Sequence, residues 1–162
     1  MATTVKEAIQ SHSFFRDFPA DQLEPIEEIS EIVEYDEGDQ IIYTDKPADR
    51  FLLILEGNVL IEVESQEGDQ LPVQKLSGGK ILGWSWLISP HDWEFDASAA
   101  TDVRVVEIDG DKLRKLCEDK QDLGTRIKSE LIDVLAERLS SIRYLLLDIQ
   151  QTTDEFQQLT GG

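Results

Sequence analysis

The chain has few of the residues that build disulfides and metal sites. Its 162 residues include one cysteine, Cys117, and two histidines, His12 and His91. One cysteine excludes a disulfide within the chain, and two distant histidines without a cysteine pair do not make a structural zinc site. Because Cys117 lies on the apolar side of a helical pattern, we expect it to be a small buried core residue.

Basic residues are also scarce. Lys and Arg number 15 against 34 Asp and Glu, which gives a net charge of −19. A protein that binds nucleic acid needs a basic face to displace phosphate counterions, and a surface that docks on anionic lipid needs the same. The composition therefore excludes nucleic acid and anionic membranes as expected partners.

Long hydrophobic runs and catalytic motifs are missing as well. No apolar segment approaches the roughly 20 residues that span a bilayer, and the N-terminus lacks a signal-peptide core. No P-loop, G-x-S-x-G or H-x-H signature and no nucleophile–base pair is present. We expect a cytoplasmic protein that is not an enzyme. Residues 1–150 are expected to form one domain, and residues 151–162 a polar, flexible tail.

Helical patterns open the chain and short strands follow. Residues 5–29 have a helical pattern interrupted by a hydrophobic turn, and Asp21 is expected to cap a helix that begins at Gln22. From Ile32 onward, short β-rich segments alternate with turns, among which Gly38 and Gly57 suit tight reversals. Val103, Val105 and Ile108 are expected to point inward from the last strand. This spacing predicts a sandwich or barrel.

One long helix is predicted over Leu123–Ile149. Its apolar positions recur every three or four residues and form one stripe, which is too long for a small β core to bury. The surplus stripe favours pairing with the same helix of a second copy, so we expect a homodimer through Leu123–Ile149.

The pattern as a whole resembles the cyclic-nucleotide-binding domain of the catabolite activator and fumarate–nitrate regulator (Crp/Fnr-like) superfamily, from about Phe14 to Leu146. Four segments carry the resemblance: Phe15-Arg-Asp-Phe, Tyr35-Asp-Glu-Gly-Asp-Gln-Ile-Ile, Ala48-Asp-Arg-Phe-Leu-Leu-Ile-Leu-Glu-Gly-Asn-Val and Gly79-Lys-Ile-Leu-Gly-Trp-Ser-Trp-Leu. The resemblance implies a mainly β fold with flanking helices: a double-stranded β-helix, or jelly-roll-like β-roll, with N-terminal helices and a long C-terminal dimerisation helix.

The sequence departs from the family at the ligand site. In the family, a short helix begins at the position of Gly83 and directs backbone N–H groups at a cyclic phosphate, which an arginine neutralises. Here the family's Gly-Glu pair reads Gly83-Trp84, and Trp93 stands at the arginine position. No Arg or Lys lies between Gly83 and Ala100. Cyclic nucleotide is therefore a doubtful ligand, and the sequence identifies no other cofactor.

Three tryptophans and a phenylalanine gather in this segment, and two interpretations stay open. The rings either fill the space that a ligand occupies in the family, or line a pocket for a flat or apolar ligand. The candidate ligand-binding residues are Gly83, Trp84, Ser85, Trp86, Trp93, Phe95 and Ser98.

The C-terminus departs from the family as well. Thirteen residues follow Ile149, which is too few for a helix-turn-helix. The resemblance is thus to a stand-alone regulatory domain that acts through a protein partner. We expect a homodimeric small-molecule sensor; the alternative is a ligand-free interaction scaffold whose roll is filled by indoles and whose acidic surface docks on a basic partner.

Overall fold

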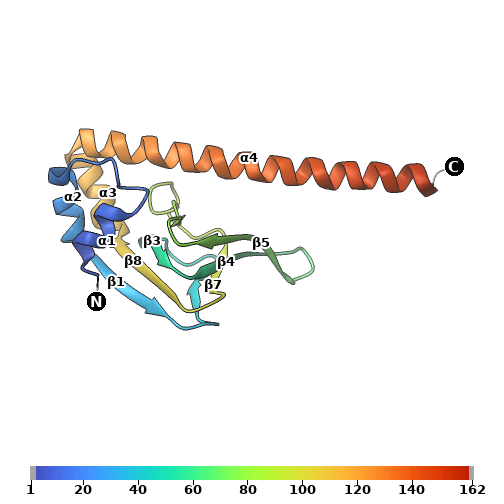
Figure 1. Cartoon of the computed structure of the whole chain (residues 1–162), viewed down its shortest axis with the longest axis horizontal. Helices are drawn as coiled ribbons and strands as arrows, with labels where there is room; N and C mark the ends of the chain where they lie inside the picture. The colour runs from blue at the N-terminus through green and yellow to red at the C-terminus, as the bar shows by residue number, and fades with distance from the viewer. Residues whose placement is uncertain (1–2, 161–162) are drawn as a thin grey trace. The chain divides into compact units, whose positions relative to one another are not determined.

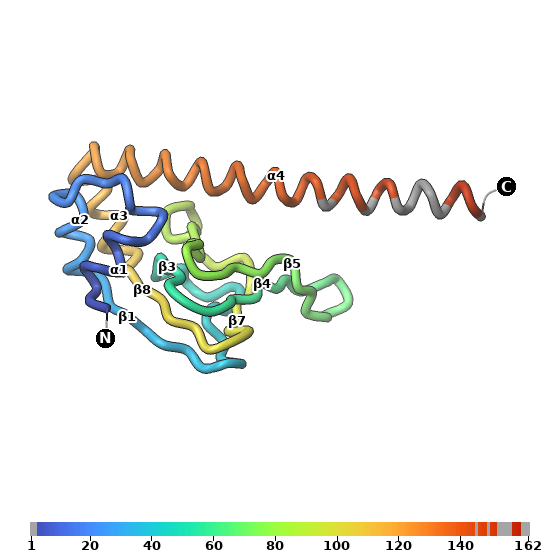
Figure 2. Tube along the Cα trace, viewed as in Figure 1, coloured from blue at the N-terminus to red at the C-terminus, as the bar shows by residue number. Residues whose placement is uncertain are grey.

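The computed structural model describes residues 3–160, without the side chains of Leu145, Ile149, residues 152–156 and Thr160 (Figures 1 and 2). Contacts divide the chain into two units, Met1–Gly124 and Thr125–Gly162, and each is described by itself.

Two short helices open the first unit. Helix α1, Val5–Ser11, begins with a capping box in which the Glu7 N–H donates to Thr4 Oγ1 at 3.1 Å. Helix α2, Ala20–Glu27, has Pro19 as its N-cap. The predicted cap at Asp21 is therefore wrong. The ring of Pro19 fixes φ near the helical value and the helix starts two residues earlier than expected, which leaves Asp21 in the first turn.

The strands of the first unit form two four-stranded antiparallel sheets, which confirms the predicted β-roll class (Figure 1). One sheet has the order β1-β8-β3-β6 and the other β2-β7-β4-β5. Their bounds are β1 Ser30–Tyr35, β2 Gln40–Ile42, β3 Arg50–Glu56, β4 Asn58–Glu64, β5 Gln70–Ser77, β6 Ile81–Leu82, β7 Asp96–Ala99 and β8 Val103–Asp109.

The expected turn glycines are confirmed. Gly38 and Gly57 have φ angles of +92° and +93°, a region that costs other residues strain. At Gly57 space is also limiting, because an added Cβ would lie 2.2 Å from the carbonyl oxygen of Asp102. Strands β3 and β4 lie in different sheets and do not pair, so Gly57 stands at a corner between the sheets, where both the backbone angle and the neighbouring chain require glycine.

Strand β8 is covered on both faces. Val103 and Val105 lie in the core between the two sheets, as expected. Ile108 is fully buried but lies on the opposite face, because successive side chains alternate and helices α1 and α3 contact this strand. The expectation that Ile108 shares the inner face is wrong, and Glu107 takes that place.

Two helices end the chain. Helix α3, Gly110–Asp119, is capped by Asp109 and buries Cys117, as predicted. Helix α4, Gln121–Thr160, continues past Ile149 without a break, so no helix end marks the expected boundary at residue 150. Gly161 and Gly162 of the expected tail lie outside the described residues. Within the described part of the chain, no helix combines the length and apolarity needed to cross a bilayer.

Candidate functional site

The candidate site lies between β6 and β7, in the segment for which the resemblance implies a phosphate-binding cassette. The segment opens with two successive turns, in which the Leu87 N–H donates to the Trp84 carbonyl at 3.0 Å and the Ile88 N–H to the Ser85 carbonyl at 3.3 Å. No regular helix begins at Gly83 in this described segment. The implied helix N-terminus, and the row of N–H donors that it would offer a phosphate, is therefore a wrong expectation.

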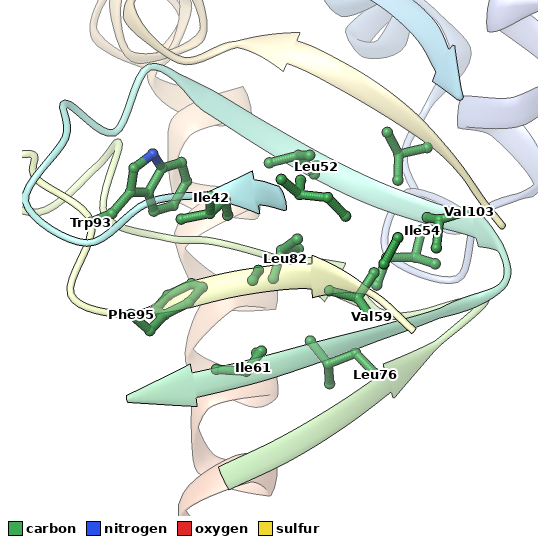
Figure 3. Packing of buried hydrophobic residues seen from close by; sticks show 14 of the residues in the cluster. Ile42, Leu52, Ile54, Val59, Ile61, Leu76, Leu82, Trp93, Phe95 and Val103 are labelled. Atoms are coloured by element: carbon green, nitrogen blue, oxygen red, sulfur yellow. The ribbon is translucent and has the colours of Figure 1, made fainter. Parts of the chain in front are cut away.

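Trp93 and Phe95 lie inside the roll (Figure 3). Trp93 has 2% of its surface exposed and Phe95 8%, and their ring centroids are 5.8 Å apart. Both belong to the cluster that we call the roll core. Its members are Ile41, Ile42, Ala48, Leu52, Ile54, Val59, Ile61, Leu76, Leu82, Trp93, Phe95, Ala97, Ala99, Val103 and Val105.

The indole of Trp93 lies directly on Gly83. A Cβ added to Gly83 would come within 2.5 Å of the ring, and the φ of Gly83 is +89°. Because Gly83 has no side chain, there is room for the indole at this position. The side chain of Trp93, which the resemblance leads us to expect at the family's arginine position, thus fills space within the roll core.

Main-chain hydrogen bonds hold the Trp93 segment in place. The Trp93 N–H donates to the Lys46 carbonyl at 2.9 Å, and the Trp93 carbonyl accepts from the Asp45 N–H at the same distance. The Ala48 N–H donates to the His91 carbonyl at 2.7 Å. The segment is thus fixed to the loop between β2 and β3 on both sides of the indole.

Trp84, Ser85 and Trp86 do not join this pair as one cluster. Trp84 is half-buried, with its ring 6.3 Å from that of Phe95. Trp86 is fully buried outside the roll core, with its ring 5.4 Å from that of Phe51. Its carbonyl accepts from Arg114 Nη1 of α3 at 2.6 Å. Ser85, which precedes it, is also buried, and the structure separates Trp86 from Trp93.

Ser98 also lies apart from the roll core. It is on β7 between Ala97 and Ala99, whose side chains are in the roll core. Because side chains alternate along a strand, Ser98 projects from the other face, where its hydroxyl donates to Glu62 Oε1 at 3.4 Å. The structure therefore brings together Gly83, Trp93 and Phe95, with Trp84 at their edge, and not the other candidates.

The sequence reasoning missed a partly buried ionic network that joins Arg50, Tyr35 and Glu107. Arg50 Nη1 donates to Glu107 Oε1 and, at 2.9 Å, to the hydroxyl of Tyr35, while Nη2 donates to the Ile41 carbonyl at 2.8 Å. The Tyr35 hydroxyl donates in turn to Glu107 Oε1 at 2.9 Å. Glu107 has 8% of its surface exposed.

These surroundings change two pKa values. Burial, together with the negative charge of Glu107, raises the pKa of Tyr35 to about 12. Burial alone would lower the pKa of Arg50, but the hydrogen bond and charge of Glu107 outweigh it and raise that pKa. The sequence pattern that could have predicted the burial of Glu107 is the period-two alternation of β8, because Glu107 follows Val103 and Val105 on the inner face of this strand.

The comparisons with known proteins place the chain in a family. The model described as "Cyclic nucleotide-binding domain" matches residues 32–120. The chain therefore belongs to the cyclic nucleotide-binding domain family.

Individual relatives agree with this assignment. A CRP-like cAMP-activated global transcriptional regulator of Mycobacterium tuberculosis (strain H37Rv) is 26% identical over 117 residues, which are 72% of this chain and 50% of the relative. The chain spans about half the length of the curated relatives it matches. The crystal structure of a candidate cyclic nucleotide-binding protein from Geobacter metallireducens GS-15 is 32% identical, with a TM-score of 0.74, and the match covers 86% of this chain and 99% of that chain.

A more distant structure shows the fold alone. It is the regulatory subunit of a cAMP-independent protein kinase A from Trypanosoma brucei, 18% identical with a TM-score of 0.67, matched over 83% of this chain and 46% of that chain. The curated relatives and this subunit are regulators.

Proposed function

We propose that the chain is a homodimeric regulatory module that acts on a protein partner, and that the cyclic-phosphate position of its roll is filled by its own indole. The observation that carries the first part is the unpartnered apolar face of α4. The observation that carries the second is the burial of Trp93 against Gly83.

Among the described side chains of α4, exposed Ile132, Leu139, Ile142 and Leu146 and half-buried Leu135 fit a heptad, whereas exposed Leu147 and Leu159 do not. Leu123, Ile127 and Leu131 are buried, and the exposed series begins at Ile132. Its a positions are Ile132, Leu139 and Leu146, and its d positions are Leu135, Ile142 and Ile149, of which the side chain of Ile149 lies outside the described residues. Leu139, Ile142 and Leu146 border an apolar groove of about 360 Å³. An exposed heptad of this kind supports pairing with the same helix of a second copy, over a shorter face than the sequence suggested.

The dimer is tested by placing a charge on this face. Ile142→Glu is expected to convert a dimer to a monomer at micromolar concentration, because two carboxylates would be buried against each other at a d position. Light scattering coupled to size exclusion measures the mass. Tyr144→Glu is the matched control: its side chain is 69% exposed and lies at the outward f position, so the dimer should persist. A monomeric wild type, or a dimeric Ile142→Glu, contradicts the proposal.

Two forms of the module differ in what the roll does. A small-molecule sensor would bind its ligand beside Gly83, Trp84, Ser85, Trp86, Trp93, Phe95 and Ser98 and change the state of α4. A ligand-free scaffold would keep Trp93 and Phe95 as permanent core. The burial of these two rings, and the separation of Trp86 and Ser98 from them, support the scaffold better.

A thermal-shift screen separates the two forms. We expect no rise in melting temperature with cAMP or cGMP, because no Arg or Lys between Gly83 and Ala100 compensates a phosphate. A ligand present at a hundred times its Kd would add about 2.7 kcal/mol and be plainly visible. A cAMP-binding domain of the same family serves as positive control. A rise with cyclic nucleotide contradicts the filled roll, and a rise with an uncharged aromatic metabolite supports the sensor.

The partner follows from the charge of the chain. With a net charge of −19, the surface favours association with a basic protein surface and makes it dependent on salt.

A further inference from the structure

His12 lies where the N-terminal helices meet the segment that leads to the candidate site. Its imidazole has 4% of its surface exposed. Nε2 lies 3.2 Å from the Lys80 carbonyl oxygen, and Nδ1 is 3.1 Å from the backbone nitrogen of Phe14. The hydroxyl of Ser13 donates to the Gly79 carbonyl. These contacts fix the turn after α1 to the two residues that precede β6.

The two ring contacts define one protonation state. Nδ1 accepts from the Phe14 N–H, so it carries no proton, and the proton of the neutral ring is assigned to Nε2, which donates to Lys80. A second proton would have to sit on Nδ1 and would face the Phe14 N–H, placing two donors against each other. The contact with Phe14 therefore exists only while the ring is neutral.

The surroundings of the ring also disfavour a positive charge. Burial lowers the pKa of His12 below 6.5, and the like charge of Arg16 lowers it further, while the carbonyls of Lys80 and Ile54 act in the opposite direction. Arg16 is the charged side chain whose field acts on this ring.

We propose that His12 is a latch that opens on acidification: the neutral ring holds α1 and the turn after it to Gly79 and Lys80, and a second proton releases them. Phe14 transmits the change, because its ring is 5.2 Å from that of Phe51, which is 5.4 Å from Trp86 in the cassette segment. The latch thus couples pH to the segment between β6 and β7, and it does not depend on dimerisation or on a ligand.

Nuclear magnetic resonance of the full chain tests the latch. Between pH 7.5 and 5, the amide signals of Phe14, Gly79 and Lys80 should shift with the midpoint of the His12 ring, which should lie below 6.5. Acidification raises the ratio of released to latched molecules. The largest possible rise is about tenfold for each pH unit by which the midpoint of the latched ring lies below 6.5. Stability should fall as pH drops below 6.5 and level off below the midpoint of the folded state, where folded and unfolded chains both carry the proton.

The chain provides its own control, because it has only two histidines. His12→Gln keeps a donor near the Nε2 position and does not titrate, so the amide shifts should disappear. His12→Asn, which keeps an acceptor near the Nδ1 position, is a second non-titrating variant should the first not fold. His91→Asn should leave the shifts unchanged, since Asn tolerates the left-handed φ of 64° found there. Shifts that persist in either His12 variant, a ring midpoint at or above 6.5, or wild-type amides that do not respond to pH would overturn the latch.

Discussion

Replacing Trp93 with alanine is expected to lower the free energy of unfolding by about 3–5 kcal/mol, the usual loss for a large buried aromatic side chain. The indole is 2% exposed and packs within the roll core against Gly83 and Phe95. Its removal leaves a cavity between two sheets whose strands cannot close on it. Urea unfolding measures the loss. Trp84→Ala is the control, and because Trp84 is half-buried its loss should be clearly smaller. Equal losses for the two variants would show that Trp93 is not a core residue.

The same cavity gives a second readout. Free indole should raise the melting temperature of Trp93→Ala and leave the wild type unchanged, because dry apolar cavities bind matching apolar molecules.

The contact between Gly83 and Trp93 can be tested with a double variant. Gly83→Ala in the wild type combines left-handed strain with a clash against the indole, and is expected to cost about 2–4 kcal/mol. In the Trp93→Ala background the clash is gone, so the cost should fall to that of Gly38→Ala, where φ is +92° and an added Cβ meets nothing within 4 Å.

Replacing Glu107 with alanine is expected to cost about 1–3 kcal/mol, because Arg50 and Tyr35 lose the acceptor that they share, while Arg50 stays 27% exposed and keeps Asp49 at 3.3 Å. Glu107 is the anionic partner of Arg50 and accepts from Tyr35, and these groups lie beside the roll core. Urea unfolding at neutral pH measures the loss. The pKa of Tyr35, raised to about 12, should fall toward its ordinary value of 10.0 when the carboxylate is removed, which an absorbance titration detects.

The double variant Arg50→Met, Glu107→Leu distinguishes two contributions to stability. One is the loss caused by removing Glu107 while Arg50 keeps its charge, and the other is the net contribution of the Arg50–Glu107 pair. Apolar groups of similar size often replace a buried ion pair without loss, so the double variant should be more stable than Glu107→Ala. If the double variant is the less stable of the two, the ionic network contributes net stability that apolar packing does not replace.

Local chemistry let the sequence predict the fold elements. Period-two runs separated by turn residues gave the strands, and glycines at positions 38 and 57 gave two of the reversals, because a positive φ is a local demand that few other residues meet. The predicted cap at Asp21 failed for a local reason too: Pro19 competes for the start of the same helix.

The candidate site was less predictable, because adjacency in sequence does not determine which layer a side chain enters. Trp84, Trp86 and Trp93 stand within ten residues of each other, yet they lie at the edge of the roll core, against Phe51, and inside the roll core, respectively. Two turns after Gly83 redirect the chain between the first two rings, and the loop between β2 and β3 fixes the third.

The sequence by itself determined the family and the absence of a basic residue between Gly83 and Ala100, which is enough to make a bound phosphate poorly compensated. Only the tertiary structure decided that the ring of Trp93 is buried in the roll core. The ring fits there because Gly83, earlier in the same connection between β6 and β7, has no side chain in its way. The tertiary structure likewise brought Arg50 and Tyr35 to Glu107 from separate strands, since a buried charge finds its partner through the packing of sheets and not through spacing along the chain.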